Sequence, residues 1–315
     1  MSWTPSDIPD LGGRTAVVTG ANAGLGLEIT AALAARGAHV VMACRNTVKA
    51  EAAADAVRRR SPGARLEVRT LDLADLDSVA AFADGLLGAH DRLDVLVNNA
   101  GLMAVDESRT AQGFEMQFGV NHLGHFALTA RVLPLLLATP GSRIGTMSSM
   151  GHRAARGLPD PRLDRPYRRW QAYFRSKLAN LLFTAELQRR LAGAGASTIA
   201  VAAHPGGSHT ELGREGTSVL NRVALAVAGR LAQSAEAGAR PMLRAVTDPA
   251  VRGGEFYGPR HLLRGAAPVR ETPSRAARDA DAARRLWDRS VELTGLEPAV
   301  VAVRRSGSGG AGPVA

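Results

Sequence analysis

A tyrosine and a lysine four residues apart form the pair best suited to acid–base chemistry. Tyr173 and Lys177 lie in residues 171–191, where apolar side chains recur at the spacing that predicts one long helix. Residues four apart share a helix face. A nearby ammonium lowers the pKa of a phenol by favouring phenolate. The pair therefore predicts a proton donor or acceptor; the alternative is an aromatic residue and a cation on an ordinary amphipathic helix.

The lysine of this pair is rare in the chain. Lys49 and Lys177 are the only lysines among 39 basic residues, and the rest are arginines. An ammonium is compact and its pKa responds to its surroundings, whereas a guanidinium stays charged. Lys177 therefore indicates a role that arginine would fill poorly, with chance as the alternative.

A glycine-rich turn follows the first predicted strand, residues 14–19, and leads into an alanine- and leucine-rich helix. Glycines allow a tight turn and let a pyrophosphate approach the backbone, while the helix N-terminus offers free N–H groups. This pattern predicts a dinucleotide site, against the alternative of a plain βα turn. The residues expected in it are Gly20, Asn22, Gly24, Leu25 and Gly26.

The end of the second predicted strand, residues 39–44, indicates which dinucleotide binds. Folds that bind NAD usually carry an acid about 20 residues past the glycines, where it binds the ribose hydroxyls. This chain has Arg45 at that place and no acid. A cation suits a 2′-phosphate, so we expect NADP(H), with NAD(H) less favoured. A surface arginine that merely leaves a strand is the alternative.

Predicted strands and helices alternate along the chain, and one long helix is predicted from Phe114 to Leu137. The predicted strands are residues 14–19, 39–44, 66–71, 93–97, 143–147, 198–203 and 255–257. This order predicts the α/β class: a doubly wound parallel sheet of about seven strands, a Rossmann fold with three αβα layers. Ligands bind such sheets at the carboxyl ends of strands. We therefore expect Asn98, Ala100 and Gly101 to contact the cofactor.

Together these motifs resemble the short-chain dehydrogenase/reductase superfamily. The matches, in family order, are Thr19-Gly20-x-x-x-Gly24-x-Gly26, Asp72-Leu73, Asn98-Asn99-Ala100-Gly101, Asn121, Ser149, Tyr173-x-x-x-Lys177 and Pro205-Gly206. Residues 43–46, 121–126, 176–180 and 204–206 resemble its retinol dehydrogenase and protochlorophyllide reductase-like branch. The resemblance implies an NADP(H)-dependent oxidoreductase that interconverts a carbonyl and an alcohol on a small lipophilic substrate by hydride transfer.

The resemblance also implies residue roles. Tyr173 would exchange the proton with the substrate oxygen, and Lys177 would lower its pKa and hold the nicotinamide ribose. Ser149, rather than Ser148, would hydrogen-bond the carbonyl, and Asn121 would anchor a water that leads protons to Lys177. The further cofactor-binding residues implied are Asp72, Leu73, Pro205, Gly206 and Thr210. We expect no metal ion in this site.

The chain length suits a single domain over residues 1–300. Residues 207–240 are expected to include a substrate lid, because 219–231 is apolar with few charges; an ordinary packed helix is the alternative. Residues 301–315 are rich in glycine and serine without periodicity, which predicts a disordered tail.

Composition limits the class of protein further. The chain has 315 residues, 45% hydrophobic residues and a net charge of +10, but its arginines are scattered and not interleaved with aromatic residues, so we expect no nucleic-acid partner. No apolar run reaches 18 residues, so no membrane span is expected. The single cysteine, Cys44, fits a reducing cytoplasm. The partner expected is a small carbonyl or alcohol, bound by a monomer or a homo-oligomer.

Two other functions compete with the dehydrogenase. One is a non-catalytic dinucleotide sensor or interaction module, which would have no need of Tyr173. The other is a basic protein that binds nucleic acid or a membrane surface, which the scattered arginines weaken.

Overall fold

One eight-stranded sheet runs through the structure, a computed structural model that describes residues 3–159, 161–162, 166–207, 234–261 and 264–300. The strand order across it is β3-β2-β1-β4-β5-β6-β7-β8. The strands are β1 (Thr15–Thr19), β2 (His39–Cys44), β3 (Arg65–Thr70), β4 (Val95–Asn98), β5 (Arg143–Met147), β6 (Ile199–Ala203), β7 (Phe256–His261) and β8 (Arg264–Glu271). The order reverses between β1 and β4, which is where sheets of this kind bind ligands.

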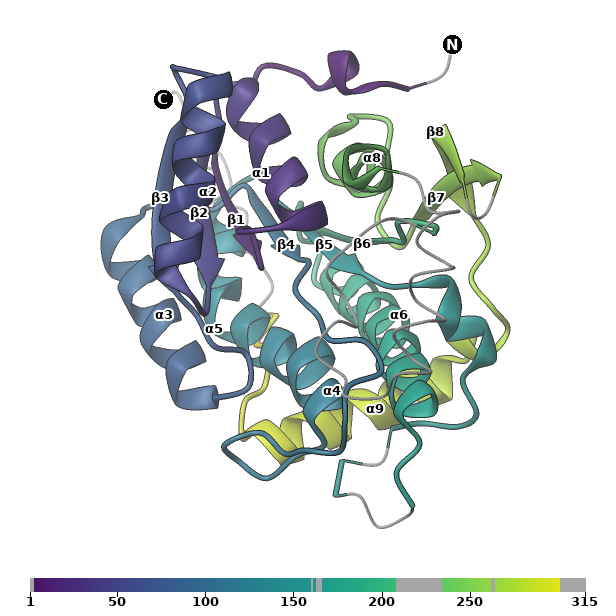
Figure 1. Ribbon diagram of the computed structural model, residues 1–315. Helices are drawn as coiled ribbons and strands as arrows, with labels where there is room; N and C mark the ends of the chain where they lie inside the picture. The colour runs from purple at the N-terminus through teal and green to yellow at the C-terminus, as the bar shows by residue number, and fades with distance from the viewer. Residues whose placement is uncertain (1–2, 160, 163–165, 208–233, 262–263, 301–315) are drawn as a thin grey trace, which may run out of the picture.

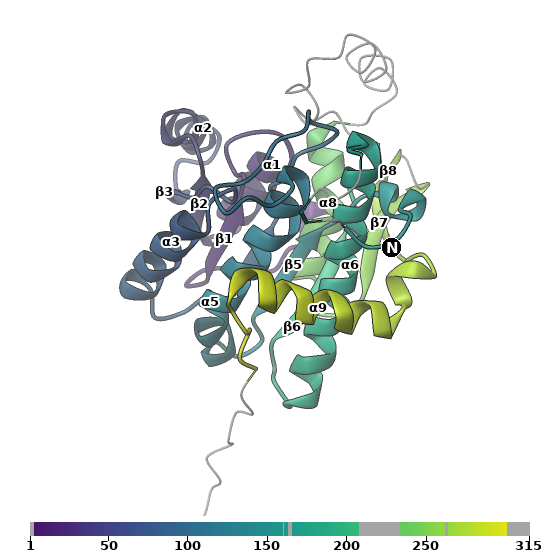
Figure 2. The same cartoon turned by 90° about the horizontal axis from the view of Figure 1, so that it is seen from below.

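Helices cover both faces of the sheet, which confirms the predicted three layers (Figure 1). On one face lie α1 (Gly24–Ala35), α2 (Thr47–Arg60) and α8 (Ala235–Thr247). On the other lie α3 (Leu76–Ala89), α5 (Gly124–Ala138) and α6 (Arg169–Gly193). The last helix, α9 (Ala280–Thr294), packs outside α6 (Figure 2).

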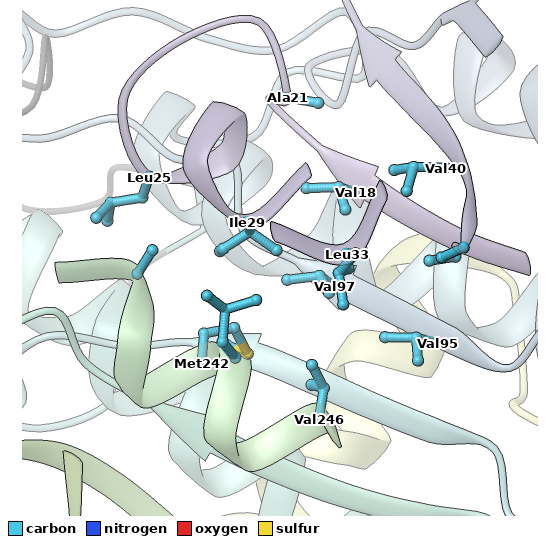
Figure 3. Packing of buried hydrophobic residues seen from close by; sticks show 14 of the residues in the cluster. Val18, Ala21, Leu25, Ile29, Leu33, Val40, Val95, Val97, Met242 and Val246 are labelled. Carbon is cyan, nitrogen blue, oxygen red and sulfur yellow. The ribbon is translucent and has the colours of Figure 1, made fainter. Parts of the chain in front are cut away.

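The packing of α1 and α8 over the sheet shows how the first layer is held (Figure 3). Ile29 and Leu33 of α1 and Met242 of α8 meet Val18 and Val97 of the central strands, and all five are fully buried. Burying a side chain of this size stabilises the fold by about 1.5–3 kcal/mol. The central strands β1 and β4, whose ends carry the cofactor loops, are therefore firmly fixed.

The eighth strand was not predicted from the sequence. β8 is antiparallel to β7 and forms an edge of the sheet, with Pro259 opposite Pro268. Proline and glycine in Arg264–Glu271 argue against a strand on sequence grounds, yet proline is tolerated on an edge strand because no neighbour needs its missing N–H.

The helix predicted from Phe114 to Leu137 is present over residues 116–138, but it contains a π-helical turn that divides it into three parts. These are α4 (Met116–Phe118), a π-helical turn η2 (Gly119–Leu123) and α5. A π-turn inserts one residue into the helical repeat without changing the apolar pattern much, so periodicity does not reveal it. Such turns are frequent at functional sites.

Other expectations fall partly outside the described residues. The predicted lid loses its C-terminal part, because residues 235–240 begin α8 and pack on the sheet. Residues 208–233 and 301–315, with the predicted tail, lie outside the described ranges. Within the part of the chain that the structure describes, no helix is long and apolar enough to cross a membrane.

Candidate active site

A cleft of about 390 Å³ lies at the carboxyl ends of the central strands. Its walls come from the glycine turn after β1, the end of β2, the segments after β3 and β4, and α6. It brings together most of the residues predicted from the sequence. Those that line it are Gly20, Asn22, Gly24, Leu25, Gly26, Arg45, Asp72, Leu73, Ala100, Gly101, Tyr173, Lys177 and Pro205.

The glycine turn leaves no space for a side chain at Gly26. A Cβ there would lie 2.2 Å from the Gly20 carbonyl oxygen and 2.6 Å from Asn99 Nδ2. Thr19 ties this turn to the end of β4, because its hydroxyl accepts the backbone N–H groups of Asn99 (2.9 Å) and Ala100 (3.0 Å). The turn is thus packed tightly at the N-terminus of α1, which carries no side-chain cap, and free N–H groups at a helix N-terminus suit a dinucleotide pyrophosphate.

Asn98 is a correction to the predicted cofactor contacts. Its side chain is buried under the sheet and donates to Thr129 Oγ1 at 3.1 Å. The next residue, Asn99, lines the cleft instead and donates from Nδ2 to the Thr19 carbonyl at 2.9 Å. The alternation of side chains along a strand could have predicted this, because Asn98 lies on the same face of β4 as Leu96, which packs against α5.

The opposite end of the cleft is basic. Arg45 lies directly after β2, and Asn46 caps α2 by accepting the backbone N–H of Lys49 at 2.9 Å. Arg45, Asn46 and Lys49 are exposed and all line the cleft. Two cations beside a helix N-terminus attract an anion. Lys49 was not predicted from the sequence as a cofactor-binding residue, although its rarity as one of two lysines could have indicated it.

Tyr173 is held in the cleft wall as a neutral phenol. The side chain is 6% exposed. Burial raises its pKa, and a hydrogen bond from Ser149 works in the opposite direction. The expected lowering of the Tyr173 pKa by Lys177 is not found: the ammonium Nζ lies 5.9 Å from the ring centroid and burial prevails.

The two serines after β5 do different things. The Ser148 hydroxyl borders the cleft but donates to the Lys177 carbonyl at 2.8 Å, which fixes α6. Ser149 lies just outside the residues that line the cleft. Its hydroxyl accepts the Gly151 N–H at 3.1 Å and forms a hydrogen bond with the phenol of Tyr173. The geometry therefore places Ser149, and not Ser148, beside the phenol.

Lys177 is a buried cation that donates to a backbone carbonyl. It is 4% exposed, and Nζ donates to the Met147 carbonyl at 3.3 Å. Burial lowers its pKa to about 8. The space around the ammonium is tight, because a Cβ on Gly101 would come within 3.2 Å of Nζ and 3.1 Å of Asn121 Oδ1.

Asn121 lies in the π-turn, fully buried behind Gly101. Its side chain forms two hydrogen bonds with the backbone of Leu102: Oδ1 accepts the N–H at 2.7 Å, and Nδ2 donates to the carbonyl at 2.9 Å. Nδ2 also donates to Ser176 Oγ at 2.8 Å. Its backbone carbonyl faces His125 Nδ1 at 3.1 Å. The side chain therefore positions the loop after β4, next to Lys177.

A buried histidine joins the Pro205–Gly206 loop to the edge strand. Gly206, which lies outside the cleft lining, donates its N–H to His204 Nδ1 at 3.1 Å, so Nε2 carries the proton and donates to Glu271 at 3.1 Å. Next to it, His152 faces the Ser149 carbonyl through Nδ1 at 2.7 Å. The sequence could not reveal this pairing, because β8 was not predicted. Thr210 lies outside the described residues.

The chain belongs to the short-chain dehydrogenase family, because the family model described as short chain dehydrogenase matches residues 14–219. It lies in the retinol dehydrogenase-like branch. Human retinol dehydrogenase 13 is 41% identical over 293 residues, with 90% of this chain and 86% of that protein covered. Membership confirms an oxidoreductase that acts on carbonyl and alcohol groups.

Two solved structures extend the comparison. An uncharacterized protein from Mycobacterium paratuberculosis is 45% identical with a TM-score of 0.79, covering 94% of this chain and 99% of that one. A protein described as an NAD(P)-dependent gluconate 5-dehydrogenase from Beutenbergia cavernae, with bound NADP at low occupancy, is 27% identical. Its TM-score is 0.61, and the match covers 79% of this chain and 96% of that one.

Proposed function

We propose that this protein is an NADP(H)-dependent reductase or dehydrogenase of small lipophilic carbonyls and alcohols, with Tyr173 as the proton donor or acceptor. The observation that carries the proposal is one cleft with a neutral phenol beside Ser149 and Lys177 at one end and two cations at the other. A dinucleotide sensor needs only the second of these ends.

The reacting end supports general acid catalysis. The chemistry supplied by a bound NADP(H) is hydride transfer to or from the substrate carbon. Tyr173 would donate its phenolic proton to the oxygen that gains negative charge, and take it back in the reverse direction. Ser149 would stabilise the same charge with its hydroxyl. A raised pKa keeps Tyr173 protonated until that charge develops.

Lys177 would act on both the phenol and the cofactor ribose. A pKa of about 8 leaves much of it charged near neutral pH. A positive charge at this place favours the phenolate that remains after proton donation. The path for replacement protons, past Asn121 to Lys177, remains a prediction.

The basic end supports NADP(H) over NAD(H). Arg45 and Lys49 line the cleft where an acid would bind the ribose hydroxyls of NAD. The protein described with bound NADP shares 27% identity with this chain. The Gly26 contacts and the free N-terminus of α1 suit the pyrophosphate between the two ends.

The wall near the phenol supports a lipophilic substrate. Beyond Gly101 the cleft is lined by Leu102, Met103 and Val105, which offer no charge to a substrate. The similarity to retinol dehydrogenase 13 points the same way. Cytoplasmic location, oligomeric state and the contribution of the lid remain predictions.

A substrate panel followed by NADPH absorbance tests the proposal. Long-chain and cyclic aldehydes and ketones should be reduced with NADPH, with lower efficiency for NADH and for short polar carbonyls. The Ser149→Ala variant should lose turnover, and Ser148→Thr, which keeps a hydroxyl at the neighbouring position, is its matched control. Tight NADPH binding without turnover of any carbonyl or alcohol would favour the sensor.

A further inference from the structure

Two histidines and a glutamate meet beside the edge strand β3 of the sheet. His39 begins β2, Glu67 lies in the middle of β3, and His90 follows the last residue of α3. Each of these three described side chains offers one atom that can bind a metal ion, and the three atoms lie within 4.8 Å of one another. β2, β3 and α3 lie together at one side of the molecule in both views (Figures 1 and 2).

Two of the three spacings match those of ligands around one ion, and the ligand nitrogens of the two histidines lie within 4.8 Å of each other. Glu67 Oε2 lies 3.4 Å from His39 Nε2 and 3.1 Å from His90 Nε2. A tetrahedral zinc ion with bonds of about 2.0–2.1 Å separates neighbouring ligand atoms by roughly 3.3 Å. From this geometry we infer a site for a zinc-like transition-metal ion, bound by His39, Glu67 and His90.

The ligand types select the ion. Two imidazole nitrogens and one carboxylate oxygen suit Zn²⁺, Co²⁺ or Ni²⁺, whereas Mg²⁺ and Ca²⁺ prefer all-oxygen sites. The side chains of His39, Glu67 and His90 are 29%, 28% and 11% exposed. An ion can therefore enter from solvent, and water can fill a fourth position.

The glutamate is already oriented for this role. Its other oxygen, Oε1, accepts a hydrogen bond from Arg69 Nε, which leaves Oε2 directed at both imidazoles. Outer hydrogen bonds of this kind hold carboxylate ligands in place around metals. Burial raises the pKa of Glu67, but Arg69 and the two histidines outweigh it, so the carboxylate stays ionised.

The charges near the site act in both directions. Burial lowers the pKa of His39, and His90, Arg65 and Arg69 lower it further, while Glu67 raises it. The same arginines repel a cation, so we expect binding weaker than in a site of three or four unopposed anionic ligands.

The site is separate from the proposed chemistry. His39 is four positions before Ala43 of the cleft wall on β2, which corresponds to about 13 Å along a strand. A bound ion would join the edge strand β3 to β2 and to the end of α3. Its effect is therefore expected on stability and not on NADPH binding.

Calorimetry and thermal melting with tag-free protein test the inference. Adding ZnCl₂ should show one saturable equivalent and raise the melting temperature by about 3–6 °C at saturation, because an ion that binds only the folded state stabilises it. Co²⁺ should give the visible absorption of a tetrahedral complex, and MgCl₂ should change nothing. The NADPH affinity with zinc bound should stay within about twofold of the zinc-free value. These binding measurements do not require the protein to have catalytic activity.

Variants separate this site from adventitious binding. His39→Asn/His90→Asn should abolish the zinc equivalent, and the single His90→Asn change should weaken it even if the double variant folds poorly. His261→Asn removes an exposed histidine of β7 and should leave zinc binding intact. Absence of saturable zinc binding in the wild type, or unchanged binding in His90→Asn, would overturn the inference.

Discussion

Glu271 on the edge strand β8 accepts a hydrogen bond from the buried His204 Nε2 at 3.1 Å. The pair is packed so closely that a Cβ on Gly258 would lie 2.1 Å from Nε2. Through Nδ1, His204 also receives the Gly206 N–H. The edge strand therefore positions the loop that carries Pro205 into the cleft.

Removing this carboxylate should impair the cofactor loop without removing any group from the cleft. Glu271→Ala leaves a buried N–H of His204 without its partner, and we expect KM for NADPH to rise about tenfold with a smaller fall in kcat. Glu271→Gln keeps an acceptor oxygen and should recover most of the loss. Glu292→Gln, an exposed change on α9, is the control. Equal losses in both Glu271 variants would contradict a positioning role.

The positive end of the cleft should determine cofactor choice. Arg45→Asp and Lys49→Met should each reduce kcat/KM for NADPH by about 10–100-fold, because a hydrogen bond to a charged group contributes about 1.5–3 kcal/mol. NADH, which lacks the 2′-phosphate, should be affected little. Arg59→Gln, at the far end of α2, serves as the control. Unchanged NADPH preference in Arg45→Asp would exclude Arg45 from phosphate binding.

Acid stability should depend on three buried histidines. Burial lowers the pKa of His122 to about 3 and those of His125 and His152 to about 4. Unfolded histidines take up protons near pH 6.5, so the unfolded state binds more protons below that pH and stability falls as pH falls. Between pH 6.5 and 5 each histidine should contribute up to about 1.4 kcal/mol per pH unit to the slope of the unfolding free energy.

Urea unfolding at several pH values measures this slope. His122→Phe should reduce it by about one proton, because the ring lies among Phe118, Phe126 and Phe183, where a phenyl group can pack. His261→Gln, at an exposed position, should leave the slope unchanged. A pH-independent unfolding free energy over this range would show that these histidines are not neutral in the folded protein.

Local patterns predicted the parts of the site that are formed locally. The glycine turn, Arg45 and the Tyr173–Lys177 pair each depend on spacing within one strand, turn or helix, and all line the cleft. Pairing across long separations was not accessible: Glu271 meets His204 from 67 residues away. Asn98 shows a third case, in which strand alternation held the information but the motif alone was used.

The electrostatic prediction for the tyrosine failed for a physical reason. Sequence spacing places Lys177 on the face of Tyr173, but it carries no measure of burial. In the structure burial raises the phenol pKa and lowers that of the lysine to about 8. Both groups are thus shifted toward their neutral forms, and the charge that favours phenolate is weaker than a solvent-exposed lysine would supply.

Tyr173→Phe should remove the proton donor and little else. The change deletes one oxygen from a side chain already packed in the cleft wall, so fold and NADPH affinity should survive. Turnover should fall by about 10²–10⁴-fold, the usual contribution of general acid catalysis. Tyr257→Phe is the control, because its hydroxyl bonds Glu255 at 2.8 Å and the residue does not line the cleft. Near-normal turnover in Tyr173→Phe would contradict the proton-donor role and favour the non-catalytic dinucleotide sensor.

Lys177→Arg asks whether any cation is sufficient. The charge is kept, but a planar guanidinium is larger than the ammonium that fits between Gly101 and the Met147 carbonyl. We therefore expect activity to fall in both Lys177→Arg and Tyr173→Phe, with weaker NADPH binding only in the lysine variant, because only Lys177 is proposed to hold the ribose. Steady-state rates and NADPH fluorescence titrations distinguish the two effects. Full activity in Lys177→Arg would show that the site requires a positive charge alone.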